Sequence, residues 1–283
     1  MLGAIIGDMV GSVYEFHPLK SKTFNIYNPR MRMTDDSLLT LAVADVLMRH
    51  YPIKYDEEAI KAMQKDLVKG FVRAWRGHPY AGFGGKFFDW CKHAQWQEET
   101  EPYNSFGNGS AMRISPVGWI AKNEEEVKTL SKAVTEITHN HPEGLKGAEA
   151  VAMCIFLALH GASKEEIKER MINEYYPEIK SLDFGDLVKN YEFSEICQKS
   201  VPQAIYCFLI SDSLEDAIRN CVAIGGDCDT TGAMAGAIAE AYYQKDKVSE
   251  FEDKFLYLMI DPSAENTIKE FHRIINSQKF ENK

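Results

Sequence analysis

The sequence has six cysteines but neither a CxxC pair nor a regular spacing between them. Disulfide frameworks and cysteine-ligated zinc sites need such spacing, so the pattern indicates free thiols in a reducing compartment. The first residues, MLGAIIGDMVGS, lack the basic segment of a secretory signal peptide and reach an acidic side chain at Asp8. Both absences predict a cytoplasmic protein.

Long apolar runs and an excess of basic residues are also missing. The longest apolar run covers residues 151–159, far short of the roughly 20 residues that a membrane helix needs. Lysines and arginines number 32 against 42 aspartates and glutamates, a formal net charge of -10. This charge argues against nucleic acid or an anionic membrane as the main partner. A small anionic ligand would need local help from a metal ion or from helix N-termini.

Alternating strand patterns are nearly absent, and the best candidate is the short segment 22–28, KTFNIYN. Helical periodicity dominates instead. We predict helices over residues 36–49, 59–75, 124–138, 144–159, 163–172, 195–209, 214–223, 227–244 and 264–275. No internal repeat, low-complexity tract or flexible linker interrupts the chain. We expect an all-α fold, with one compact domain over residues 1–283 built as an orthogonal helical bundle.

Two helix starts carry more acidic and hydroxyl side chains than helix capping requires. The first group is Thr34, Asp35 and Asp36, and the second group is Asp227, Asp229 and Thr230. An N-cap uses one side-chain oxygen, so capping explains one residue of each group and leaves the others. The second group opens the stretch DCDTTGAMAGAIAEAYY, whose small and apolar residues are typical of a buried, close-packed helix.

Buried acidic groups of this kind need a cation. Removing carboxylates from water costs several kcal/mol unless something cationic holds them. Carboxylate and hydroxyl oxygens are the ligands that hard divalent cations such as Mg²⁺ prefer. We therefore predict that the two groups converge on a pair of divalent ions in a central cleft.

The segment 104–118, NSFGNGSAMRISPVG, places Gly107 and Gly109 before an expected helix. These glycines allow close backbone approach and positive φ, and amides at the helix start can hold phosphate oxygens. The spacing fits neither a P-loop nor a dinucleotide-binding fingerprint, and a plain turn is the structural alternative.

Two histidines and two further acids complete the candidate residues. His139 and His141 are candidate zinc ligands, although no cysteine or third histidine is near them in sequence. A helix end before a proline explains them structurally, and a neutral His139 bonded to a ligand is a third interpretation. Asp8 and Glu15 lie seven residues apart, so on one helix they would share a face. They are either surface charges or acids near the metal pair, acting as ligand, gate or base.

With these motifs assembled, the chain resembles the ADP-ribosylglycohydrolase family. The resemblance runs in order through GAIIGDMVGSVYEF, TDDS, GNGSAMRISPVG, THNHPEG and GGDCDTTGAMAGAIAEAYY, over about the first 245 residues. Each motif alone is modest, but five in this order are highly specific. The resemblance implies a compact all-α fold with two Mg²⁺ or Mn²⁺ ions in a cleft.

The resemblance also implies roles for residues at matching positions. The implied metal ligands are Thr34, Asp35, Asp36, Asp227, Asp229 and Thr230. The implied ADP-ribose site comprises Ser105, Phe106, Gly107, Asn108, Gly109 and His139. Glu15 matches a glutamate on a mobile loop near the metals, and either Glu15 or Asp36 would be the general base.

The implied activity is hydrolysis of the bond between C1 of the distal ribose and an acceptor, a reaction that needs an activated water. ADP-ribosylated arginine ranks first among acceptors, with serine-linked ADP-ribose and O-acetyl-ADP-ribose as rivals. Two other classes stay open: a non-catalytic ADP-ribose-binding or structural module, and a two-metal phosphohydrolase that cuts the pyrophosphate. A module has no reason to keep both acidic groups, and a phosphohydrolase would release AMP.

Overall fold

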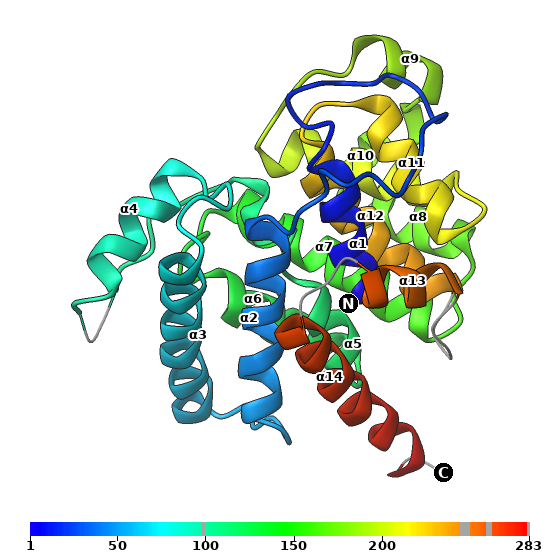
Figure 1. Ribbon diagram of the computed structural model, residues 1–283. Helices are drawn as coiled ribbons and strands as arrows, with labels where there is room; N and C mark the ends of the chain where they lie inside the picture. Colours follow the sequence, from blue (N-terminus) through cyan, green and yellow to red (C-terminus); the bar gives the residue numbers. More distant parts are fainter. Residues whose placement is uncertain (98–99, 244–249, 259–261, 282–283) are drawn as a thin grey trace.

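The structure, a computed structural model, describes residues 1–97, 100–243, 250–258 and 262–281. Its helices are α1 (Leu2–Gly11), α2 (Asp35–Arg49), α3 (Glu57–Gly77), α4 (Gly85–Ala94), α5 (Ser115–Ile120), α6 (Glu124–Thr135), α7 (Pro142–Leu159), α8 (Lys164–Glu174), α9 (Phe184–Asn190), α10 (Cys197–Leu209), α11 (Leu214–Ile224), α12 (Cys228–Tyr243), α13 (Glu250–Leu258) and α14 (Pro262–Glu281) (Figure 1). Two short 3-10 turns are η1 (Asn108–Ser110) and η2 (Pro177–Ser181). The described residues contain no strand, which confirms the predicted all-α class.

Each predicted helix is present, with its ends shifted by a few residues. Gln244, the predicted last residue of the central helix, lies outside the described residues. The candidate strand over residues 22–28 is wrong, because this segment is an irregular loop between α1 and α2. Arg219 Nη1 donates to the carbonyl oxygens of Lys22 and Phe24, both at 2.9 Å, so a side chain takes the place of a strand partner.

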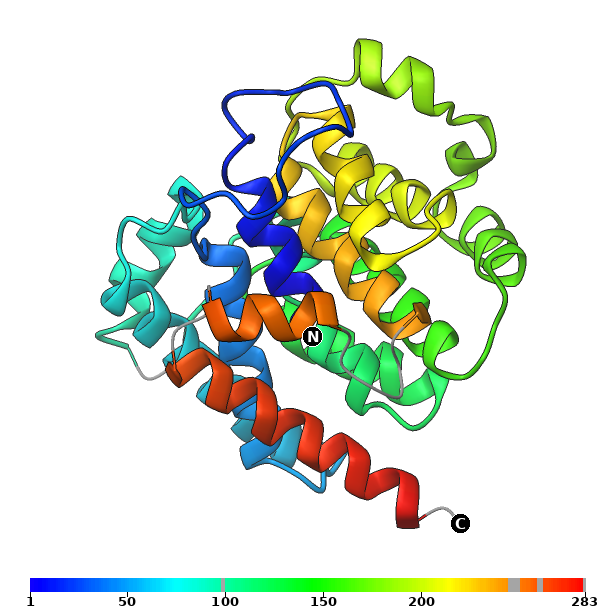
Figure 2. The same cartoon turned by 45° about the vertical axis from the view of Figure 1, so that its right-hand side comes forward.

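Helix α12 lies at the centre of the fold, in contact with α1, α7, α10 and α11 (Figures 1 and 2). All its residues from Cys228 to Ala241 are buried. Small side chains on a helix that is buried on every side let the neighbouring helices approach until the backbones are in contact. The glycines and alanines of α12 allow this approach.

Helix α1 runs antiparallel to α12 at very short distance. A Cβ atom on Gly7 would lie only 2.0 Å from the carbonyl oxygen of Gly232, so the two backbones touch. At the other end, the amides of Leu2 and Gly3 donate to the carboxylate of Glu240, which caps α1. This packing brings the end of α1 beside the start of α12.

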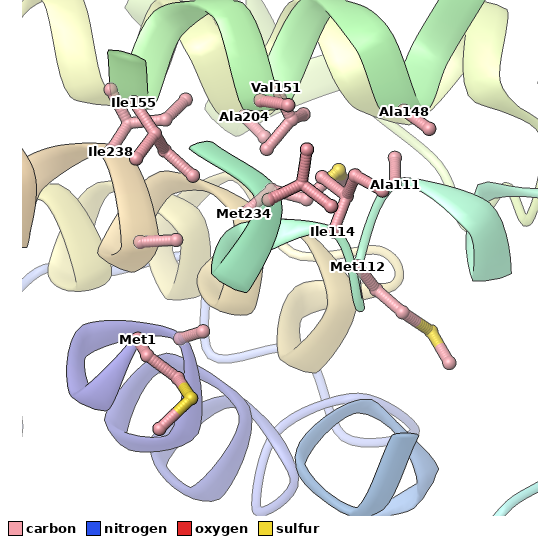
Figure 3. Packing of buried hydrophobic residues seen from close by; sticks show 14 of the residues in the cluster. Met1, Ala111, Met112, Ile114, Ala148, Val151, Ile155, Ala204, Met234 and Ile238 are labelled. Atoms are coloured by element: carbon pink, nitrogen blue, oxygen red, sulfur yellow. The ribbon is translucent and has the colours of Figure 1, made fainter. Parts of the chain in front are cut away.

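The segment before α5 lies between two helices of the core. Ile114 packs between Val151 of α7 and Met234 of α12 (Figure 3). This contact holds the preceding residues, including the glycine-rich loop over residues 105–109, close to the start of α12.

All six cysteines are free and buried, in agreement with the unpaired spacing. Among the described residues, no helix combines the length and the apolar character that crossing a membrane requires.

We predict that Gly7→Ala lowers the free energy of unfolding by about 3 kcal/mol or more, because the new methyl group has no space against Gly232. Thermal or urea unfolding measures this change. Gly70→Ala is the matched control, since Gly70 is a buried helical glycine whose Cβ would meet its nearest neighbour at an ordinary 3.6 Å. It should leave the stability unchanged or raise it by up to about 1 kcal/mol. Equal effects of the two substitutions would contradict the close α1–α12 packing.

Candidate functional site

The starts of α2 and α12 meet in the interior, although 194 sequence positions separate the residues that touch. The Thr230 hydroxyl donates to Asp36 Oδ2 at 3.4 Å. Thr34 caps α2, where its hydroxyl oxygen accepts the Asp36 amide at 3.3 Å. Gly225 and Gly226 both adopt positive φ and turn the chain from α11 into α12. The two acidic groups found in the sequence therefore face each other.

The meeting of the helix starts gathers carboxylates into two groups of three. One group is Asp8, Asp36 and Asp229, and the other is Glu15, Asp227 and Asp229. In each group, one oxygen of every carboxylate lies within 4.8 Å of the others. Asp229 belongs to both groups, so the groups adjoin. Two adjoining oxygen clusters with one shared carboxylate are an arrangement that two divalent cations fit.

Within the described residues no basic side chain forms an ion pair with these carboxylates, although the charge of Arg32 partly offsets that of Glu15. Burial raises the pKa of Asp36 well above its usual range, and the nearby charge of Asp8 raises it further. Burial and the charge of Asp227 raise the pKa of Asp229 in the same way, and burial raises the pKa of Asp227 itself to about 6. Oδ1 of Asp36 is buried without a hydrogen-bond partner among the described residues. A cation would stabilise the ionised carboxylates and occupy this free oxygen.

Asp8 organises the start of α2 from outside that helix. Its Oδ2 accepts the amides of Thr34 at 2.9 Å and Ser37 at 3.1 Å, and the Ser37 hydroxyl donates to the same oxygen. The Thr34 hydroxyl donates to Oδ1 at 2.7 Å. These hydrogen bonds use most of the lone pairs of the Asp8 carboxylate and hold Thr34 and Ser37 in place. Asp8 also adds a negative charge to the carboxylate group. The sequence placed Asp8 near the site but did not predict this bracing.

Glu15 does not share a helix face with Asp8, because α1 ends at Gly11 and Glu15 lies in the turn beyond it. The two acids accordingly fall in different carboxylate groups. Glu15 is half-buried and lines the cleft. Burial, followed by the charge of Asp229, raises the pKa of Glu15 to about 8.

Asp35 lines the cleft but belongs to neither group of three. Its amide donates to the Ala81 carbonyl at 3.1 Å, which ties the α3–α4 connection to the start of α2. Burial and the charge of Asp229 raise the pKa of Asp35 well above its usual range. Asp35 therefore adds a further negative charge to the cleft, beside the two carboxylate groups.

The residues predicted to bind metal or ADP-ribose, and Glu15, all line one cleft of about 540 Å³, whereas the candidates Asp8 and His141 do not line it. The acidic wall of the cleft comes from the starts of α2 and α12, and the facing wall comes from the loop 105–109 and His139. These facing residues are Ser105, Phe106, Gly107, Asn108, Gly109 and His139.

The loop 105–109 is bonded to both the acidic wall and α10. The Asn108 side-chain amide donates to Asp227 Oδ2 at 2.7 Å, and its backbone amide donates to the Glu195 carbonyl at 2.8 Å. The Cys197 amide donates to the Phe106 carbonyl at 3.0 Å. Phe106 lines the cleft and is 41% exposed, and its ring lies against that of His141 with the centroids 5.2 Å apart.

The two glycines of this loop give room to His139. A Cβ atom on Gly109 would lie 3.3 Å from His139 Nε2, and one on Gly107 would lie 3.6 Å from it. Neither glycine has positive φ; Asn104, the residue before the loop, adopts it instead, at 51°. The expectation of positive φ at these glycines is wrong, and close approach of a ligand to their backbone stays a prediction.

The two histidines of the 138–144 motif have separate positions. His141 caps α7, where its Nδ1 accepts the Glu143 amide at 3.1 Å. His139 is buried at the cleft. Neither belongs to a metal-binding group among the described residues, which disfavours the zinc interpretation.

Arg113 also lines the cleft, and we did not predict it from the sequence. The signal that could have indicated it is a charged residue within the mostly apolar segment SAMRISPVG.

An all-α fold with paired acidic clusters opposite a glycine-rich loop defines a class of helical hydrolases, and sequence comparison identifies the family. The family model described as ADP-ribosylglycohydrolase matches residues 1–252. The chain therefore belongs to the ADP-ribosylglycohydrolase family, whose members are enzymes that hydrolyse glycosyl bonds of ADP-ribose.

Individual relatives agree with this assignment. The chain is similar to ADP-ribosylhydrolase ARH3 of Mus musculus, with 26% identity over 88% of this chain and 84% of the relative. It is similar to ADP-ribosylarginine hydrolase Tri1 of Pseudomonas putida, with 26% identity over 86% of this chain and 69% of the relative. A solved structure described as an ADP-ribosylglycohydrolase-related protein complex has the same fold, with a TM-score of 0.69, 23% identity and 97% coverage of both chains.

We predict that Asp8→Ala lowers the free energy of unfolding by about 3 kcal/mol, because the donors of Thr34 and Ser37 lose a buried acceptor. Chemical denaturation measures the change. Asp45→Ala, on the exposed face of the same α2 helix, is the control and should stay within about 0.5 kcal/mol of the unmodified protein. An Asp8→Ala protein as stable as the control would contradict the bracing role.

Proposed function

We propose that the protein is a metal-dependent hydrolase that releases ADP-ribose from modified acceptors by cleaving the bond at C1 of the distal ribose. The acceptor that we rank first is ADP-ribosylated arginine. The observation that supports this function best is the pair of carboxylate groups that share Asp229 and face the loop 105–109 across one cleft. Family membership supports the same chemistry.

We assign two Mg²⁺ ions, or Mn²⁺ in their place, to the acidic wall of the cleft, where the two carboxylate groups adjoin at Asp229. Their protein ligands would come from Thr34, Asp35, Asp36, Asp227, Asp229 and Thr230. The free Oδ1 of Asp36 and the raised pKa values of the aspartates support this assignment, because both indicate uncompensated negative charge. When bound, such a pair supplies Lewis acidity toward the distal ribose and its water.

The opposite wall would hold the ADP-ribose. The Gly107–Gly109 stretch lets a diphosphate approach the backbone closely, and Phe106 offers an exposed ring for stacking. His139 would bond a polar group of the same ligand. These contacts would fix the distal ribose against the carboxylates, so that C1 faces the reactive side of the cleft.

The general base would be a carboxylate of the acidic wall. Glu15 suits this role better than Asp36, because Glu15 is half-buried on a turn while Asp36 is enclosed by Thr34 and Thr230. A base at this position takes the proton of the attacking water as the bond to the acceptor breaks. Asp36 would then hold a cation.

An arginine acceptor fits the charge of the cleft. Glu15, Asp35 and Glu195 line it in addition to the buried aspartates, so its acidic side chains outnumber its basic ones, Arg32, Lys86 and Arg113. A guanidinium group is a cation that pairs well with carboxylates. The name of the Pseudomonas putida relative, ADP-ribosylarginine hydrolase, points the same way.

We also propose that residues 1–283 form one catalytic domain and act in the cytoplasm. The family match over residues 1–252 and the 97% coverage of the solved structure support one domain. Six free, buried thiols support a reducing compartment.

Metal binding should stabilise the protein through Asp229. We predict that Mg²⁺ at 100 times its dissociation constant adds about 2.7 kcal/mol to the free energy of unfolding. Asp229→Asn should abolish this gain and raise the stability of the metal-free protein, since it removes like-charge repulsion. Calorimetric melting with and without EDTA measures both effects, with Asp45→Asn as the surface control. A Mg²⁺-induced gain that survives in Asp229→Asn would overturn the assignment.

Release of ADP-ribose should depend on both acidic groups. We predict that Asp36→Ala and Asp227→Ala each lower the turnover of ADP-ribosylated arginine by at least about 100-fold. Chromatography of the products from arginine, serine and acetyl substrates measures the reaction and ranks the acceptors. Full activity after metal removal would refute the proposal, AMP as product would indicate a phosphohydrolase, and binding without turnover would indicate a module.

A further inference from the structure

Arg113 is a buried cation at the edge of the cleft. Its side chain is fully buried, and its guanidinium carbon lies 4.3 Å from the centre of the Phe71 ring. The Nη2 group donates to the Thr138 hydroxyl oxygen at 2.7 Å, and Nε and Nη1 have no hydrogen-bond partner among the described residues. Within the described residues, the guanidinium group of Arg113 therefore has one hydrogen-bond partner, the hydroxyl of Thr138.

The Thr138 hydroxyl connects Arg113 to His139. Thr138 Oγ1 lies 2.8 Å from His139 Nδ1 and 3.4 Å from the Thr135 carbonyl oxygen. A hydroxyl has a single proton to donate, and a guanidinium can only donate. Because Arg113 donates to Oγ1, the hydroxyl proton is available for Nδ1, which is the nearer of its two acceptors.

The shorter of the two contacts favours donation of the Thr138 proton to His139 Nδ1 over donation to the Thr135 carbonyl oxygen. If Nδ1 accepts from Thr138, a neutral imidazole must be protonated at Nε2. Nε2 is the atom that lies beside Gly107 and Gly109, at the cleft. Burial and the neighbouring charge of Arg113 both lower the pKa of His139 well below its usual value, which favours the neutral ring.

The geometry points to Arg113 and Thr138 as positioning residues that hold His139 as the Nε2–H tautomer. In this form His139 donates a hydrogen bond into the cleft, so it would recognise an acceptor oxygen of the ligand. The identity of that ligand as ADP-ribose rests on the proposed function, whereas the tautomer does not.

The tautomer can be measured on the protein without any ligand. Long-range ¹H–¹⁵N correlation spectra at neutral pH distinguish an imidazole protonated at Nε2 from one protonated at Nδ1 and from an imidazolium. The signal of His139 is identified by its loss in His139→Gln. We expect the Nε2–H tautomer, and either of the other two forms would overturn the inference.

Substitution of Thr138 tests the chain of bonds. Thr138→Val removes the hydroxyl at nearly constant shape, so the Nε2–H form should lose its dominance, and Thr138→Ser should restore it. Thr135→Val is the matched control, because the Thr135 hydroxyl is buried one turn away without a hydrogen-bond partner among the described residues. It should leave the spectrum of His139 unchanged. A spectrum of Thr138→Val identical to that of the control would contradict the role of Thr138.

Calorimetry with ADP-ribose adds a functional readout. Thr138→Val should weaken binding about three- to tenfold, as expected for one disordered hydrogen bond, while Thr135→Val should bind normally. Equal affinity of both variants would contradict the positioning role. If the unmodified protein does not bind ADP-ribose, the proposed function fails, and the spectra alone still decide the tautomer.

Discussion

The structure depends on one arrangement: carboxylates from distant parts of the chain meet inside the protein at the starts of two helices. Asp36 lies in the first turn of α2, Asp229 lies in the first turn of α12, and Asp8 from α1 lies with them in one group. Like charges at this distance repel and lose hydration, so the fold holds them only through strong packing elsewhere. The backbone contact between α1 and α12 supplies that packing, because it involves the elements that carry Asp8 and Asp229.

The two walls of the cleft differ in chemistry, and the difference accounts for the reaction that we propose. One wall is a set of buried carboxylates suited to cations, and the other combines a glycine-rich loop, the buried His139 and the partly exposed ring of Phe106. Asn108 joins the walls, since its amide reaches Asp227 at 2.7 Å. A ligand with a diphosphate, a ribose and an aromatic base matches this combination, despite the negative charge of the whole chain.

Much of this arrangement is predictable from sequence, because helical periodicity and an excess of acids at a helix start are local signals. The all-α class and the approach of the two acidic groups follow from them. Contacts between distant parts of the chain are not predictable in this way. The sequence pattern of residues 22–28 favours a strand, but in the structure the Arg219 side chain binds the backbone carbonyls of this segment, which is a loop. Helices α1, α4, α9 and α13 are not among the predicted ranges. The bracing by Asp8 depends on how α1 packs.

The central claim is that the shared carboxylate of Asp229 lies between two cations. Crystals grown with Mn²⁺ and measured at the manganese absorption edge test it most directly, since anomalous scattering locates each ion independently of the refined protein. The account predicts two peaks on either side of Asp229, one beside Asp36 and one beside Asp227. A single peak, or peaks remote from Asp229 at saturating Mn²⁺, would contradict it.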